Sequence, residues 1–183
     1  TPLYSSAASD VYKRQAWYQG IKISLFDVTD VTAPKEIDKH EIGDRGTDSP
    51  ILSDHKAFLF DKEKNLLVIP VLVAEINPAK YPGGEIPPYT YGEFVWDGAY
   101  VFKISLEQGL ELQGKITHLE NNLALMKSGY YYNSQYSVKR SLYIDNVLYT
   151  VSGLKIKMNS LIDLTEINTC LLYTSPSPRD RTR

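Results

Sequence analysis

The hydrophobic pattern is densest in Leu66–Val73, where nearly every residue is aliphatic. Such a run is typical of a strand that is covered on both faces. The residues before it, Asp54–Phe60, predict a second apolar strand, and the charged residues Asp61–Asn65 predict a solvent-facing turn between the two. The chain is therefore expected to be organised around a hairpin over Asp54–Val73, with a bulge or a strand end near Pro70.

Other segments alternate between apolar and polar residues with the period of two that predicts half-exposed strands. A tight hairpin is expected around Asp145-Asn146, because these residue types tolerate left-handed backbone geometry. Lys35–Ile42 is charged along its length, as expected of a strand at a solvated sheet edge. The alternating segments are Ile21–Asp27, Phe94–Leu106, Val138–Tyr143, Val147–Val151 and Leu154–Met158.

Two long connections separate these strands, Glu75–Glu93 and Leu119–Tyr136, and both contain many tyrosines. The hairpin at Asp54–Val73 and the later hairpin around Asp145 share the order lysine, apolar strand, aspartate turn, apolar strand. An all-β chain of similar hairpins favours radially stacked, four-stranded antiparallel sheets. The prediction is a partial β-propeller of about two blades of a larger ring, with a β-sandwich as the alternative.

The two ends of the chain are expected to have a different origin from the rest. A coding sequence for Asp10–Gln15, read on its complementary strand in another frame, gives Cys170–Thr174 followed by the start of serine. The shared element resembles the mosaic end of transposase-based sequencing libraries. We therefore expect residues 1–15 and 170–183 to be adapter-derived tails and residues 16–169 to be the native, partial β-propeller domain.

Without these tails the net charge is about −5, and the only cysteine, Cys170, is excluded. The sequence then contains no disulfide framework and no thiol nucleophile. No basic stripe indicates a nucleic-acid partner. No apolar run is long enough to predict a membrane span within the fragment.

The ordered phrases SLFDVTDVTAPKEIDKHEIGDRGTDS, SDHKAFLFDKEKNLLVIPV, YGEFVWDGAYVFKISLEQGLELQGKITH and VKRSLYIDNVLYTVS resemble a known family. It is the β-propeller domain found in secreted or surface-anchored prokaryotic proteins, which is distantly similar to WD-repeat propellers. The resemblance covers nearly all of Tyr18–Asn168. It implies a propeller located outside the cytoplasm or on the cell surface, and it carries over no established activity.

The candidate binding residues are aromatic, namely Tyr89, Tyr91, Trp96 and Tyr131. Tyrosine and tryptophan combine a large contact area with a polar group, which suits protein or carbohydrate ligands. The alternative is that Trp96 belongs to the core of the sheet and that the tyrosines cover it.

Five polar residues are interpreted as structural rather than catalytic. Asp27 and Asp30 suit turn capping better than calcium binding, because DVTDVTAPKE lacks the further acidic positions and the glycine of a calcium loop. Asp54 and His55 are expected in a hydrogen-bond network, and Arg45 in an ion pair that fixes a loop between strands. The sequence indicates no catalytic residue, no metal ligand and no cofactor.

Two functions follow from this pattern. The first is a non-catalytic scaffold or binding domain of an exported or cell-surface protein. The alternative is an extracellular hydrolase or metal-dependent enzyme with a site at the propeller axis. Convergence of Arg45, Asp54 and His55 would favour the enzyme, and their dispersal into separate turns would favour the scaffold. Fold alone does not decide between them.

Overall fold

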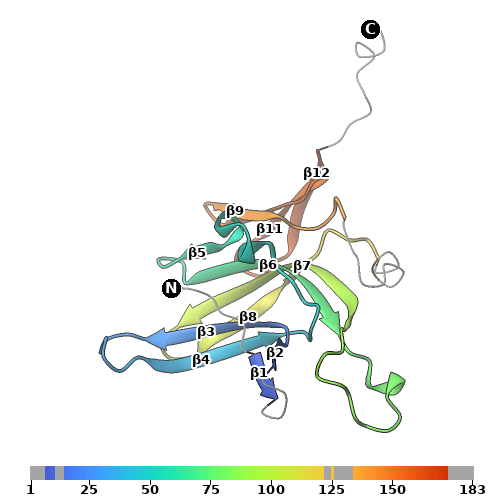
Figure 1. Cartoon of the computed structure of the whole chain (residues 1–183). Coiled ribbons are helices and arrows are strands. Elements are labelled where there is room, and N and C mark those ends of the chain that lie inside the picture. Colours follow the sequence, from blue (N-terminus) through green and yellow to red (C-terminus); the bar gives the residue numbers. More distant parts are fainter. Residues whose placement is uncertain (1–6, 11–14, 122–124, 126–133, 173–183) are drawn as a thin grey trace, which may run out of the picture.

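The computed structural model describes residues 7–10, 15–121, 125 and 134–172. The described residues form an all-β structure with two four-stranded antiparallel sheets. The predicted fold class is thereby confirmed. In Figure 1 the main sheets and the β3–β4 hairpin lie as three layers, with the β5–β8 sheet in the middle.

The central sheet has the strand order β5-β6-β7-β8. Every pair in it is antiparallel. Its strands are β5 (Leu59–Asp61), β6 (Leu66–Glu75), β7 (Glu93–Ser105) and β8 (Gly109–Ile116). The segment Asp54–Phe58 differs from the prediction, because His55–Ala57 form the 3-10 turn η2, with Asp54 as its N-cap.

The second sheet has the order β12-β11-β10-β9. Its hairpin around Asp145 is as predicted, and Asp145 adopts a φ of 52°. Its strands are β9 (Arg140–Ile144), β10 (Val147–Val151), β11 (Lys155–Ser160) and β12 (Glu166–Leu171). Cys170 and Leu171 pair with β11.

Two smaller hairpins complete the described structure. Strands β3 (Ile21–Asp27) and β4 (Lys35–Ile42) pair with each other, as do β1 (Ala7–Asp10) and β2 (Gln15–Tyr18). Lys35–Ile42 had been expected at a sheet edge, and β4 is exposed over most of its length.

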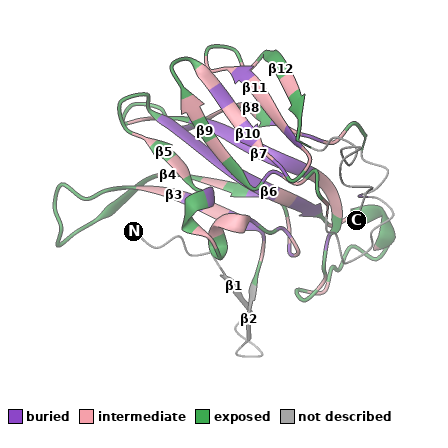
Figure 2. Ribbon diagram, turned by 90° about the horizontal axis from the view of Figure 1, so that it is seen from above, coloured by how far each residue is buried: buried purple, intermediate pink, exposed green. Residues whose placement is uncertain are grey.

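The apolar core lies on both faces of β6, as its sequence predicts. Alternate residues of β6 point to opposite faces of the sheet. Leu67, Ile69, Val71 and Val73 pack toward β3 and β4, whereas Leu66 and Val68 pack toward the β9–β12 sheet. Figure 2 shows β6 and β7 as the most continuously buried strands. This double coverage fixes the three layers relative to one another.

The two four-stranded sheets approach each other closely along the β5 and β9 edges, where two polar contacts of β9 join it to β5 and to the loop before β5. The Tyr143 hydroxyl on β9 donates a hydrogen bond to Asp61 Oδ2 at the end of β5. The His118 ring, just after β8, hydrogen bonds to Thr150 on β10.

The connections differ between the two ends of the sheets. At the end where β6 finishes, which we call the loop end, the chain forms the long connections 43–58, 76–92 and 117–139. The loop end also holds one short connection, 152–154, whereas at the opposite end, the turn end, the connections 62–65, 106–108, 145–146 and 161–165 are all short. The candidate site is at the loop end.

Candidate binding site

A loop takes the place of the edge strand β5 along the second half of β6. Strand β5 pairs only with Leu66–Val68. Beyond it, Asp48 and Leu72 exchange two backbone hydrogen bonds of 2.9 and 2.8 Å. The Thr47 hydroxyl bonds both the amide and the carbonyl of Ala74, and the Ser49 hydroxyl donates to the carbonyl of Pro70.

This arrangement explains why β6 continues through Pro70, where a strand end or bulge was expected. The Leu72 amide donates to Asp48 and so points toward the loop. Backbone amides alternate in direction along a strand, so the nitrogen of Pro70, two residues earlier, faces the same side. Pro70 lies between the last pair of β5 and the Asp48–Leu72 bridge, so its missing amide proton removes no ladder hydrogen bond. The register shift occurs farther on, between Val73 and Ala74.

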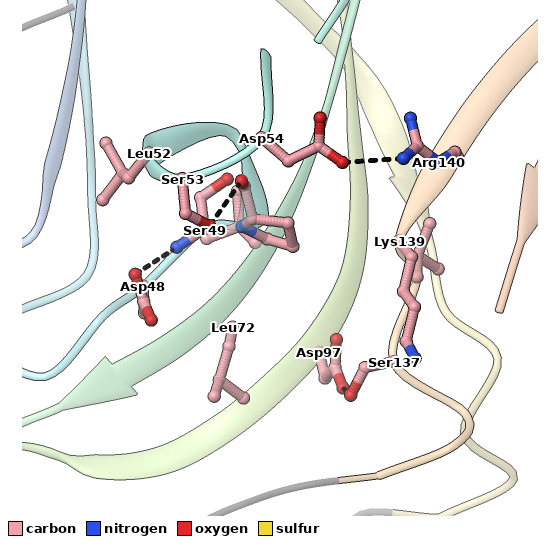
Figure 3. A pocket seen from close by; sticks show the side chains of 13 residues that line it. Asp48, Ser49, Leu52, Ser53, Asp54, Leu72, Asp97, Ser137, Lys139 and Arg140 are labelled. Atoms are coloured by element: carbon pink, nitrogen blue, oxygen red, sulfur yellow. Dashed lines mark hydrogen bonds and ion pairs between the residues drawn. The ribbon is translucent and has the colours of Figure 1, made fainter. Parts of the chain in front are cut away.

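The loop and the seam between the two sheets enclose a groove with a volume of about 570 Å³. One wall is formed by the loop around Asp48 and by the β6 residues Val71 and Leu72. The other wall is the segment that leads into β9 (Figure 3). The volume is within the range of small-ligand sites. The polar side chains of the lining are Asp48, Ser49, Ser53, Asp54, Asp97, Ser137, Lys139 and Arg140.

Two polar contacts cross the groove and hold its walls together. The Ser137 hydroxyl donates a hydrogen bond to Asp97 Oδ2, which joins the segment before β9 to β7. Arg140 Nη2 lies 2.7 Å from Asp54 Oδ2, which joins β9 to the loop (Figure 3). Asp97 is buried, whereas the Arg140–Asp54 pair is half exposed. A carboxylate in the interior has lost its hydration, which costs on the order of several kcal/mol when no partner replaces the water. The Ser137 hydroxyl supplies such a partner to Asp97.

The groove has charges of both signs but no aromatic side chain in its lining. Asp48 and Lys139 are exposed on opposite walls. One carboxylate oxygen of Asp48 accepts a hydrogen bond from the Ser49 amide at 2.8 Å. Ser49 is itself buried by its contact with Pro70. The buried hydroxyl of Ser49, at the floor of the groove, is thus fixed by the fold. The accessible charges, Asp48 and Lys139, form its rim.

Arg45, for which an ion pair was predicted, packs against two tyrosine rings. Its guanidinium carbon is 4.3 Å from the ring centroid of Tyr91 and 5.2 Å from that of Tyr18, and Nη2 donates to the Tyr91 hydroxyl at 3.1 Å. The neighbouring Asp44 accepts a hydrogen bond from the Ile76 amide. We call Tyr18, Arg45 and Tyr91 the arginine clamp, because they tie the 76–92 connection to the body of the protein.

The clamp shifts the phenol pKa values in opposite directions. The hydrogen bond from Arg45 lowers the pKa of Tyr91, because a cation favours the phenolate. Burial raises the pKa of Tyr18, and its contact with Tyr91 acts in the same direction.

The structure separates the predicted aromatic residues. Tyr89 and Tyr91 lie in the 76–92 connection with exposed fractions of 57% and 44%. Trp96 lies in β7 and packs edge-on against Tyr100, with centroids 5.1 Å apart. Lys115 covers both rings. Tyr131 is outside the described residues.

The predicted structural residues occupy local hydrogen-bonded turns. Asp27 Oδ1 accepts from the amide and hydroxyl of Thr29, and Asp30 Oδ1 accepts from those of Thr32. These bonds lower the pKa of both aspartates. His55 is exposed in η2. Of Arg45, Asp54 and His55, only Asp54 lines the groove, so the three residues do not form one site.

Sequence reasoning did not identify Asp97, Ser137 or His118 as site or seam residues. A signal for Asp97 was present, because it is the only charged residue within the apolar run FVWDGAYVF. A charge in a buried strand needs a partner. Its partner Ser137 is 40 residues away and belongs to another sheet, so spacing alone does not find it.

Among the described residues, no group of three or more histidine, cysteine, aspartate or glutamate side chains is arranged to hold a metal ion. No helix in the described part of the chain is long and apolar enough to cross a membrane.

Comparison with known proteins gives one family and one curated relative. The sequence pattern of the family described as "Beta propeller domain" matches residues 7–164. An uncharacterized protein of Methanocaldococcus jannaschii is 26% identical over 132 residues, which is 72% of this chain and 14% of that protein. The chain therefore spans about one seventh of the length of this relative. No solved structure matches the chain.

Proposed function

This chain belongs to the β-propeller domain family, and we propose that it is a non-catalytic binding domain of an exported or cell-surface protein. The observation that carries the proposal is the groove of about 570 Å³ at the seam of the two four-stranded sheets. A concave site of this volume suits a ligand, and its many positioned polar groups suit a polar one.

The polar groups of the groove support binding rather than bond cleavage. Asp97 is engaged by the Ser137 hydroxyl, and Asp54 by Arg140. Arg45, which could have assisted a reaction at the same place, belongs to the arginine clamp. These side chains therefore orient one another and shape the groove.

The ligand that we propose is a protein segment or a carbohydrate that enters from the loop end. Asp48 and Lys139 present opposite charges at the rim. The exposed rings of Tyr89 and Tyr91 lie on a connection at the same end. Tyrosine rings of this kind contribute contact area at binding surfaces.

The test is a binding screen with two probes, a displayed library of random peptides and a printed glycan array. The wild-type chain is compared with Asp48→Lys and Lys139→Glu, which reverse the rim charges. A matched control, Lys62→Glu, reverses a charge at the turn end. We expect at least one probe whose binding falls tenfold or more in the rim variants and is retained in the control. Equal binding by all four proteins, or no binder at all, would overturn the proposal.

Export rests on the family resemblance and is tested separately. Cells of the native host are fractionated, and the protein is detected with an antibody against this chain. Recovery from the cell surface or the medium supports export. Recovery from the cytosol alone refutes export and leaves the binding proposal intact.

A further inference from the structure

The face of the second sheet that packs on the central sheet carries lysines near the loop end. Thr150 of β10 lies opposite Lys157 of β11, and its hydroxyl is bonded to His118 of the central sheet. Residues directly opposite each other in the register share a face, so the Lys157 side chain lies on this covered face as well. Residues two positions apart on one strand also share a face, which places Lys155 next to it.

Lys155 is buried, with 7% of its surface exposed. Its amide donates to the Ser152 hydroxyl, and its carbonyl accepts from the Ser152 amide, so its backbone is held at the start of β11. The ammonium nitrogen lies 5.4 Å from the ring centroid of Tyr136. Within the described residues, no carboxylate or other hydrogen-bond acceptor is bonded to this ammonium.

The neighbouring Lys157 differs, because its charge is already matched. Its ammonium lies 2.8 Å from Glu166 Oε2 and donates to the Thr117 carbonyl at 3.2 Å. An ion that leaves water needs charged or hydrogen-bonded partners in its place, and an aromatic ring replaces less of the lost hydration than an anion does. The ammonium of Lys155 therefore has unfilled capacity for an anion.

A second buried group at this seam also lacks a partner. The His118 ring is 1% exposed, and among the described residues Nδ1 has no hydrogen-bond partner, although Nε2 is bonded to Thr150. A neutral imidazole has one donor and one acceptor nitrogen, and a hydroxyl can serve either of them. When Nε2 accepts from the Thr150 hydroxyl, Nδ1 carries the proton and can donate it to an anion.

His118 and Lys155 lie within electrostatic reach of each other. Burial is the largest cause that lowers the pKa of His118, and the charge of Lys155 is the next. An ammonium and an imidazole N–H are both donors that bind oxyanions in proteins. Here both are buried and both lack an acceptor among the described residues.

We propose that Lys155 and His118 form a binding site for an oxyanion, a phosphate or sulfate group, at the loop end of the seam between the two four-stranded sheets. Such a group has several acceptor oxygens, so it can accept from the ammonium and from Nδ1 at the same time. The ring of Tyr136, which is 39% exposed, lies beside Lys155 on the solvent side, and the ligand enters there. Neither Lys155 nor His118 lines the groove, so this site is independent of the ligand proposed for the groove.

The first experiment follows His118 by NMR in the full chain with isotope-labelled histidine. Four probes are titrated at neutral pH and constant ionic strength, namely inorganic phosphate, inorganic sulfate, glucose 6-phosphate and glucose 6-sulfate. We expect a saturable shift of the His118 imidazole signals with at least one probe and no saturable shift of the exposed His55. If the His118 signals saturate with none of the four probes, the proposal is wrong.

Substitution of the lysine tests whether the ion binds at this place. Lys155→Met removes the charge and keeps a side chain of similar length, and we expect the Kd measured at His118 to rise about tenfold or more, because a charged donor is lost. Lys22→Met is the matched control, since Lys22 is half buried and paired with Glu36 on the β3–β4 hairpin. It should keep the wild-type Kd. An unchanged Kd in Lys155→Met overturns the proposal.

Urea unfolding provides a readout that does not depend on the histidine signals. Sulfate stabilises proteins in general because it is excluded from their surface, whereas an ion that binds the native state adds stability by mass action. We expect sulfate to stabilise the wild type and Lys22→Met more than Lys155→Met. Lys155→Gln takes its place should Lys155→Met fail to fold. Equal gains in all the proteins would contradict the proposal.

The affinities of the four probes distinguish a free ion from a group carried by a larger ligand. Tighter binding of an ester than of the inorganic ion assigns the site to a phosphorylated or sulfated ligand. Tighter binding of the inorganic ion assigns it to the free anion. Either result supports the proposed site, provided that Lys155→Met weakens the binding.

Discussion

The imidazole of His118 lies 2.9 Å from the Thr150 hydroxyl, and this contact joins the central sheet to the second sheet inside the protein. The His118 ring is 1% exposed, and its Nδ1 atom has no hydrogen-bond partner among the described residues. Burial, and then the nearby Lys155 and Lys157, lower the pKa of His118 to about 4, while Glu166 opposes the shift. The neutral ring is therefore the form that the seam requires.

The pH dependence of stability follows from this shift. The unfolded chain binds a proton at His118 near pH 6.5, whereas the folded chain does so only near pH 4. The free energy of unfolding should therefore decrease as pH falls from 6.5 to 4, by up to about 3 kcal/mol. Urea unfolding at half-unit pH steps measures the decrease.

His118→Gln should flatten this pH dependence, whereas His55→Gln, at an exposed histidine, should leave it in place. His40 contributes in the same direction, because burial also lowers its pKa. If His118→Gln keeps the full wild-type slope between pH 6.5 and 4, His118 does not control the stability of the seam.

A second prediction concerns the arginine clamp. Replacing Arg45 by alanine removes the hydrogen bond that lowers the pKa of Tyr91, so that pKa should rise. The same change should increase amide hydrogen exchange across residues 76–92, because Arg45 contacts the connection through Tyr91. NMR of ring-labelled tyrosine measures the pKa, and mass spectrometry measures the exchange.

Arg45→Lys is the informative companion variant. Lysine keeps the charge but not the planar group that stacks on two rings. We expect it to preserve part of the pKa shift of Tyr91 and to lose the protection of the connection. Wild-type exchange in Arg45→Ala would show that the connection is held by other contacts.

A third prediction tests the start of the groove-forming loop. Gly43 adopts a φ of +62°, and a Cβ atom there would lie 2.2 Å from Thr47 Oγ1. Gly43→Ala should destabilise the protein by about 2 kcal/mol or more, from the left-handed backbone and the displaced hydroxyl together. Gly83→Ala, where a Cβ atom meets nothing within 4 Å, is the control. Urea unfolding would contradict the prediction if both variants matched wild type.

A fourth prediction concerns packing at the seam. Leu148 is fully buried between the sheets, so Leu148→Ala should reduce the free energy of unfolding by about 2–5 kcal/mol through lost contacts and the cavity left behind. Leu106→Ala, at a residue that is 84% exposed, should change it by less than about 0.5 kcal/mol. Thermal unfolding of both variants provides the comparison, and equal stability would place Leu148 outside the cooperative core.

The strands and turns of the sheets could be predicted from the sequence because each depends on a pattern of neighbouring residues. The aliphatic run Leu66–Val73 specified a doubly covered strand, and Asp145-Asn146 specified a tight turn between β9 and β10. Asp54–Phe58 was assigned to a strand incorrectly, since the aspartate side chain caps a 3-10 turn by accepting from the Lys56 amide. Short polar side chains compete with the ladder in this way.

The groove could not be predicted from the sequence, because its contacts join residues that are far apart in the chain. Asp97 with Ser137 and Asp54 with Arg140 are separated by 40 and 86 positions, and the arginine clamp beside the groove joins Arg45 to Tyr91 across 46 positions. Which aspartate meets which hydroxyl depends on how the two sheets stack. Trp96 also shows that local composition does not predict which aromatic residues are available to a ligand. It follows the loop tyrosines in the sequence, but it packs on Tyr100 in the sheet.

The unequal lengths of the connections at the two ends of the sheets have an evolutionary consequence. Lengthening a flexible connection adds only slowly to its closing cost, with about 0.6 kcal/mol for each doubling. The turn end sets the register of the hairpins and tolerates little change, whereas the 76–92 connection at the loop end can gain or lose residues without moving a strand, unlike the connection 43–58, which is bonded to β6. Descendants of this protein could therefore acquire new recognition properties at one rim while inheriting the same stack of sheets.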